Sequence, residues 1–126
     1  MKTMIYLVAF GDTFDDIRET GWGCGYVMIP TSYSIIKRWQ EDCTRADMDA
    51  NMESDSLGLE YYLSKHYFQI GDEEITYTEY KTVNGQEYVV IGFDTAHSYN
   101  GPHNDFDWVL SETLKLQQLV EELEQA

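Results

Sequence analysis

Residues whose types and spacing could do chemistry are concentrated between residues 92 and 105. Asp94 and His97 lie three apart in the segment Gly-Phe-Asp-Thr-Ala-His, and His103 follows, so two of the three histidines lie close together. Carboxylate oxygens and imidazole nitrogens are ligands for zinc, and a divalent cation offsets the repulsion between neighbouring carboxylates. The residue types and spacing therefore predict a metal site built around Asp94 and His97.

A hairpin must position these residues. Two runs rich in aromatic and β-branched residues, 74–83 and 86–93, flank Asn84-Gly85, which favours the positive φ angles of a type I′ turn. A two-residue turn fixes the register of the strands, and counting back from it places Asp72 near His97 at the open end. Apolar residues of the second run fall on both faces of the strand, so this run is expected to be a central strand.

The remaining ligands of the predicted metal site are open. His103, Asp72 and Asp105 are candidates from the same region, and Cys24 could arrive from an upstream glycine-rich segment. Mixed nitrogen and oxygen ligands, with or without one sulfur, favour zinc over magnesium or calcium. Ordinary structural roles compete with this interpretation, because an aspartate after a strand often accepts backbone N–H bonds in the following loop.

The rest of the chain predicts an α+β fold: an antiparallel sheet of four or five strands, with the 74–93 hairpin at its centre and helices packed on one face. The whole chain, 1–126, is expected to be a single domain. Strands are predicted at 4–10 and 26–29, helices at 32–43 and 56–65, and a long C-terminal helix at 105–124 that Asn104 could cap. Residues 21–25, Gly-Trp-Gly-Cys-Gly, are expected to be irregular, with positive φ or a close backbone approach.

The chain is strongly acidic, with 23 acidic and 8 basic residues and a formal net charge of -15. This charge argues against direct binding to nucleic acid or to an anionic membrane, and predicts a partner with a basic surface. The candidate contact residues lie in an acid-rich stretch: Glu41, Asp42, Asp47, Asp49, Glu53 and Asp55. Two cysteines and no signal-peptide pattern favour the cytoplasm.

Motifs of known enzymes are absent: the sequence contains neither GxSxG nor GxxxxGK[ST]. A non-enzymatic binding protein is therefore the leading hypothesis. The alternative is a small metal-dependent hydrolase in which Asp94, His97 and a metal-bound water act together. A third hypothesis is an acidic structural protein that oligomerises through its many aromatic residues.

The segment Ile91-Gly-Phe-Asp-Thr-Ala-His97, together with Ile75-Thr-Tyr77 and Gly25-Tyr-Val-Met-Ile-Pro30, resembles small phage and prophage proteins. Those proteins pair a GFDxAH segment with His-Gly-Gly directly before the Ile-Thr-Tyr strand. Here Asp72-Glu-Glu74 stands in that place, so Asp72 matches the histidine. The resemblance implies an inhibitor of host defence in the host cytoplasm, similar to anti-CRISPR and DNA-mimic proteins, with a basic surface of a CRISPR effector nuclease as its partner and a structural zinc.

Overall fold

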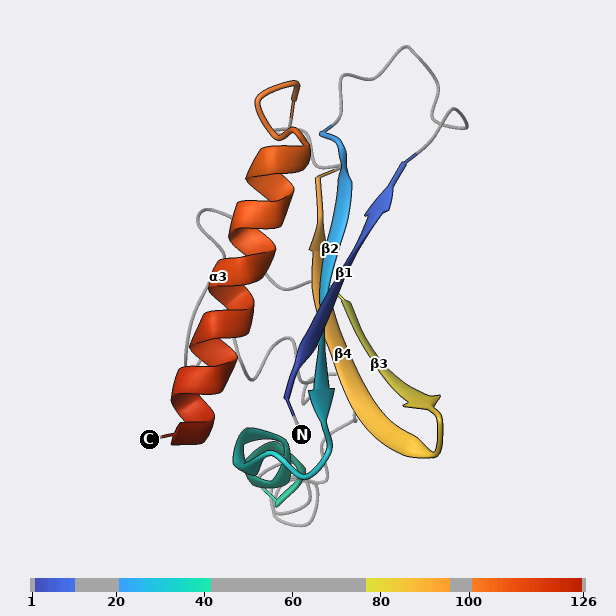
Figure 1. Ribbon diagram of the computed structural model, residues 1–126, viewed down its shortest axis with the longest axis vertical. Coiled ribbons are helices and arrows are strands. Elements are labelled where there is room, and N and C mark those ends of the chain that lie inside the picture. Colours follow the sequence, from blue (N-terminus) through green and yellow to red (C-terminus); the bar gives the residue numbers. More distant parts are fainter. Residues whose placement is uncertain (1, 11–20, 42–76, 96–100, 126) are drawn as a thin grey trace, which may run out of the picture.

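Four antiparallel strands form one sheet, in the order β1-β2-β4-β3. The computed structural model describes residues 2–10, 21–41, 77–95 and 101–125. The elements are β1 (Met4–Ala9), β2 (Gly23–Pro30), β3 (Tyr77–Val83), β4 (Gln86–Asp94) and α3 (Phe106–Gln125). Residues 34–41 are also helical. Figure 1 shows α3 lying along one face of the sheet, with helical residues 34–41 beyond the far end of β2. The α+β prediction is confirmed.

The hairpin formed by β3 and β4 has the predicted register, but in the described sheet only β4 is central and β3 lies at the edge. Asn84 and Gly85 adopt φ angles of 51° and 78°, which match the right-handed twist of the strands that they join. Val83 pairs with Gln86, and the ladder continues to Tyr77 opposite Gly92. β4 lies between β3 and β2, as expected for a strand that is apolar on both faces. Residues 74–76, which the prediction included in the first strand, lie outside the described residues.

The main core lies between the sheet and the helices. Alternate residues of β4 and β2 point toward α3, and the helix contributes side chains at helical spacing. Both predicted faces of β4 are confirmed, because Val89, Ile91 and Phe93 belong to this core whereas Tyr88 and Val90 belong to a second cluster on the other face. The buried residues of the main core are Val27, Ile29, Tyr33, Ile35, Ile36, Val89, Ile91, Phe93, Val109, Leu116 and Val120.

The N-terminus of α3 is capped by Asp105. Its Oδ1 accepts a hydrogen bond from the backbone N–H of Trp108 at 2.9 Å, which satisfies one of the free donors of the first turn. The cap is therefore one residue later than the predicted Asn104. The Asn104 side chain instead accepts a bond from Gly101 N at 3.1 Å and so closes the preceding loop.

The prediction that residues 21–25 are irregular is wrong in its second half. Gly23, Cys24 and Gly25 begin β2, and among the described glycines only Gly85 has a positive φ. Of the two predicted reasons for the glycines, positive φ is wrong and close backbone approach is confirmed. A Cβ added at Gly25 would overlap Thr113 Oγ1 on α3, and one at Gly23 would overlap the backbone of Val8 on β1.

Carboxylates tie the C-terminal end of α3 to the rest of the fold. Glu121 Oε1 accepts bonds from Thr3 N at 3.1 Å and from Tyr33 OH at 2.9 Å. Glu124 Oε2 accepts bonds from Ser34 N at 2.7 Å and from its hydroxyl at 2.8 Å, at the positive end of helical residues 34–41. Acids in the last turns oppose the dipole of α3, and for Glu121 and Glu124 these hydrogen bonds offset that cost.

The ionisation of this junction follows from its contacts. Burial alone would raise the pKa of Glu121, but hydrogen bonds from Thr3 and Tyr33 outweigh it and lower the pKa. Burial and the bond to Glu121 raise the pKa of Tyr33 to about 12. The junction therefore holds a carboxylate and a neutral phenol across the neutral pH range.

The described residues include only some of the other predicted helices and strands. Helical residues 34–41 lie within the predicted 32–43, whereas the helix predicted at 56–65 lies outside the described residues, as does any fifth strand. Among the described helices, none has the length and apolar character needed to cross a membrane.

Candidate functional site

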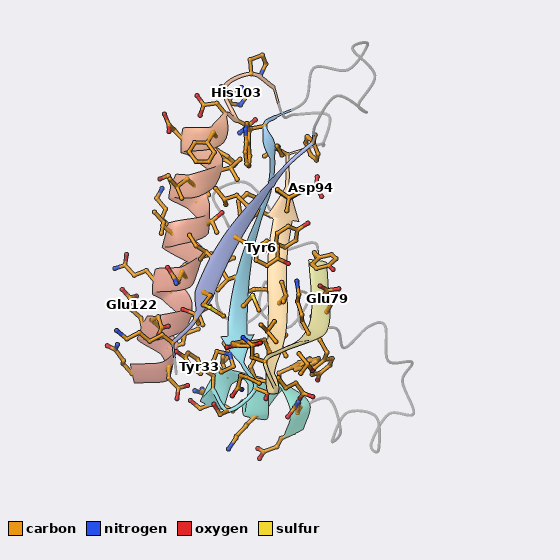
Figure 2. The ribbon with its side chains drawn as sticks, turned by 45° about the vertical axis from the view of Figure 1, so that its right-hand side comes forward. Tyr6, Tyr33, Glu79, Asp94, His103 and Glu122 are labelled. Carbon is orange, nitrogen blue, oxygen red and sulfur yellow. The ribbon has the colours of Figure 1, made fainter. Side chains whose placement is uncertain are left out.

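The predicted metal ligands are only partly within the described residues. Asp94 ends β4 and is half-buried, and His103 is exposed in the loop before α3; His97 and Asp72 lie outside the described residues. Figure 2 shows His103 above the start of α3 and Asp94 at the end of the sheet. Within residues 2–10, 21–41, 77–95 and 101–125, no three His, Cys, Asp or Glu side chains are grouped to hold a metal ion. The zinc site stays a prediction.

One alternative ligand does lie beside Asp94. Cys24 is its direct partner in the β2–β4 ladder, and both residues face away from α3. Burial and the negative charge of Asp94 raise the pKa of the Cys24 thiol, while a hydrogen bond with Tyr26 opposes them. Asp105, another alternative, uses its carboxylate to cap α3.

Thr95, in the middle of the Gly-Phe-Asp-Thr-Ala-His segment, has a structural role. Its buried hydroxyl donates to Gly23 O at 2.7 Å and accepts from Gly23 N at 3.1 Å, and its carbonyl accepts from Gly21 N at 2.8 Å. Trp22 N donates to Asn104 O at 2.8 Å. This network joins the end of β4, the start of β2 and the loop before α3. It also requires a glycine at position 21, because an added Cβ there would overlap the Thr95 side chain.

The face of the sheet turned away from α3 carries a different kind of surface. One row of paired residues crosses all four strands: Tyr6 on β1, Tyr26 on β2, Gly92 on β4 and Tyr77 on β3. We call the three tyrosines of this row the tyrosine cluster. Beneath it lies the second apolar cluster, in which Val90 is fully buried. Among the described residues, no helix packs on this face.

The tyrosine cluster is held together by ring contacts. Tyr6 stacks on Tyr26 with ring centroids 4.7 Å apart and an angle of 22°, and Tyr26 meets the edge of Tyr77 at 5.2 Å and 73°. Gly92 makes this possible, because an added Cβ would overlap the ring of Tyr26. The glycine of the Gly-Phe-Asp segment therefore leaves the space across which the tyrosines meet.

Charged groups border the tyrosine cluster. The Nζ of Lys81, on β3, lies 5.2 Å from the centroid of the Tyr6 ring, within the range of a cation–π interaction. A hydrogen bond to Glu79 and partial burial raise the pKa of Tyr77 to about 12. Burial, and then the charge of Glu79, also raise the pKa of Tyr6. Figure 2 shows Tyr6 over the middle of the sheet and Glu79 at its β3 edge.

Sequence reasoning did not find this cluster. The tyrosines lie far apart in the chain, so no local motif joins them. The signal that could have found them is the alternation within each strand, which places Tyr6, Tyr26 and Tyr77 opposite the core-facing residues. Joining them into one row required the order of the strands.

The predicted partner-binding acids fall mainly elsewhere. Glu41 is exposed at the end of the described helical segment, while Asp42, Asp47, Asp49, Glu53 and Asp55 lie outside the described residues. More than half of the acidic residues of the chain also lie there.

Comparisons of the chain with protein-family models, with curated proteins and with solved structures found no match.

Proposed function

We propose that the protein is a non-enzymatic binding protein that inhibits a host nucleic-acid-handling defence protein, such as a CRISPR effector nuclease, by covering its basic surface. The observation that carries this proposal is the net charge of -15 on 126 residues. Such a charge attracts a cationic surface over long range and repels nucleic acid. The phage-like segment directs the proposal to host defence and to the cytoplasm of the host cell.

The distribution of polar groups supports a binding role. The carboxylates of Glu121, Glu124 and Asp105 are engaged by bonds that stabilise the fold, so they are poor candidates for chemistry. The face without a described helix presents aromatic rings beside Glu79. Aromatic residues at a surface contribute large contact areas at small entropic cost, which favours recognition.

Inhibition of purified nucleases tests the proposal. DNA cleavage by a panel of CRISPR effector nucleases and restriction endonucleases is measured with increasing amounts of the protein, at about 50 and about 300 mM salt. We expect at least one enzyme to be inhibited in competition with DNA, and inhibition to weaken at the higher salt because the attraction is screened. Full activity of every enzyme in the panel, or inhibition that is indifferent to salt, would contradict the proposal.

A structural zinc is part of the proposal, with Asp94, His97, Asp72 and His103 as its ligands. Aspartate and histidine donors suit zinc, and Cys24 lies beside Asp94 on the ladder. A zinc ion there would bind the end of the hairpin to the loop before α3 and would stabilise the fold. Metal analysis of the purified protein should find about one zinc per chain, lost in Asp94→Ala and in His97→Ala. A metal-free wild type of full stability would contradict it.

A further inference from the structure

We propose that the tyrosine cluster is a receptor for an arginine side chain of the basic partner, and that Lys81 occupies this receptor in the free protein. The inference rests on the proposed function, since it names the part of the molecule that meets the partner. Its occupant is one chemical group, a guanidinium on an exposed segment of a protein.

The first observation is that a cation already lies on the cluster. Among the described strands β1 and β3 lie at the two edges, and three interstrand spacings place them about 14 Å apart in a flat sheet. The ammonium of Lys81 on β3 nevertheless lies 5.2 Å from the ring of Tyr6 on β1. Side chains from opposite edges therefore meet over the middle of this face, at a place that accepts a positive charge.

The second observation is the arrangement of the rings. Tyr6 and Tyr26 are stacked, and Tyr77 meets Tyr26 edge-on, so the cluster is preorganised by its own contacts. Aromatic faces carry the negative end of the ring quadrupole and attract cations. A planar guanidinium stacks on such a face and loses less hydration than an ammonium, so arginine is favoured over lysine as the incoming group.

The third observation is charge complementarity. Glu79 follows Tyr77 on the same face of β3, and its carboxylate raises the pKa of Tyr77, so a carboxylate borders the cluster. A guanidinium has donors to spare for this carboxylate while its plane covers a ring. Bases of single-stranded nucleic acid also stack on aromatic side chains of sheets. The net negative charge of the chain repels nucleic acid, however, and attracts a basic protein segment over long range.

Displacement of Lys81 gives the inference a sharp test. Lys81→Met removes the internal competitor together with one positive charge, and Lys37→Met removes an equal charge from the exposed side of helical residues 34–41. The probe is a fluorescein-labelled peptide of alternating arginine and threonine, with a citrulline peptide of the same shape as its neutral control. Binding is measured by fluorescence anisotropy at about 50 mM salt.

We expect the arginine peptide to bind and the citrulline peptide to bind at least about tenfold more weakly. Lys81→Met should bind the arginine peptide about three- to tenfold more tightly than Lys37→Met does. Tyr6→Leu should weaken binding by a similar factor, while Tyr6→Phe, which keeps the ring, should retain it. Circular dichroism and thermal unfolding check that each variant is folded, and the Lys81→Met comparison does not depend on altering the cluster.

The outcomes separate this inference from the proposed function. If the arginine peptide binds but Lys81→Met and Lys37→Met are equal, the receptor is wrong and the basic partner stands. If arginine and citrulline peptides bind alike, both fail. Tight binding of a labelled single-stranded oligonucleotide, or a dimer in light scattering that Tyr6→Leu dissociates, would also overturn the inference, because the face would then serve nucleic acid or a second copy.

Discussion

The two faces of the sheet are built from the same strands and differ in what covers them. On one face, Val27, Ile91 and Phe93 pack against α3 and are almost completely buried. On the other, Tyr6, Tyr26 and Tyr77 lie in one row with no described helix above them. The first face buries its apolar side chains against the helix layer, whereas the second carries the amphipathic rings that we propose meet the partner.

Side chains on the two faces of β4 are buried by different neighbours. Phe93 is buried by the helix layer, whereas Val90 on the opposite face is buried in a cluster against which Tyr6 and Tyr26 pack. A tyrosine suits this position because its ring covers apolar neighbours while its hydroxyl reaches water or a hydrogen-bond partner. Stability should therefore depend mainly on the helix-covered face, and recognition on the tyrosine face.

The largest expected loss of stability comes from a substitution on the helix-covered face of the sheet. Phe93→Ala removes a buried ring and leaves a cavity under α3, so the free energy of unfolding should fall by about 3–5 kcal/mol. Tyr77→Ala, on the exposed edge of the other face, should lower it by less than about 1.5 kcal/mol. Urea unfolding measures both, and equal losses would remove the distinction between a structural and a recognition face.

A smaller loss of stability is expected at Thr95, where the end of β4 contacts residues 21–25. Thr95→Val keeps the shape of a fully buried side chain but removes the hydroxyl that bonds Gly23 N and O, at a cost of about 1–3 kcal/mol. Thr82→Val, at an exposed position near the turn, should change stability by less than about 0.5 kcal/mol. If the two substitutions are equivalent in thermal unfolding, Thr95 is not the anchor described above.

Glu121 links the helix layer to β1 and should make stability depend on pH. The pKa of Glu121 is lower in the folded state than its ordinary value of 4.5. The carboxylate therefore makes its full contribution to folding stability above the ordinary pKa, and this contribution is lost as the pH falls through the folded pKa. Glu121→Gln should cost about 1–2 kcal/mol at pH 7. It should also flatten the decline in stability below about pH 5, because the amide does not titrate. Parallel acid titrations of wild type and variant, monitored by circular dichroism, would contradict this assignment if their slopes coincide.

Apart from the control substitutions, the smallest effect on stability is expected for Lys81→Met. An exposed cation–π contact contributes only about 0.5–1 kcal/mol, and the apolar stem of methionine retains part of the packing. Thermal unfolding should therefore detect little change in a variant whose affinity for the arginine peptide rises. A loss of more than about 2 kcal/mol would instead make Lys81 a structural residue of the tyrosine face.

Much of the fold could be predicted from local patterns. Asn84-Gly85 and the alternation in the strands beside it gave the correct register, because a two-residue turn leaves only one pairing that buries the apolar side chains. The C-terminal helix was predicted at 105–124 and is observed at Phe106–Gln125, with buried residues at helical spacing from Val109 to Val120. The glycine segment was harder, because three glycines indicate an unusual constraint without saying that the constraint is close packing in a strand.

For the site, the sequence by itself determined the acidic charge, the concentration of candidate ligands around Asp94 and the two apolar faces of the strand at 86–93. Only the tertiary structure decided that Tyr6, Tyr26 and Tyr77 form one row and that Lys81 reaches them from the opposite edge. It also assigned Thr95 to the anchoring of Gly23. The physical reason is that turn chemistry and side-chain periodicity act over a few residues, whereas strand order is set by how the whole chain buries its apolar surface.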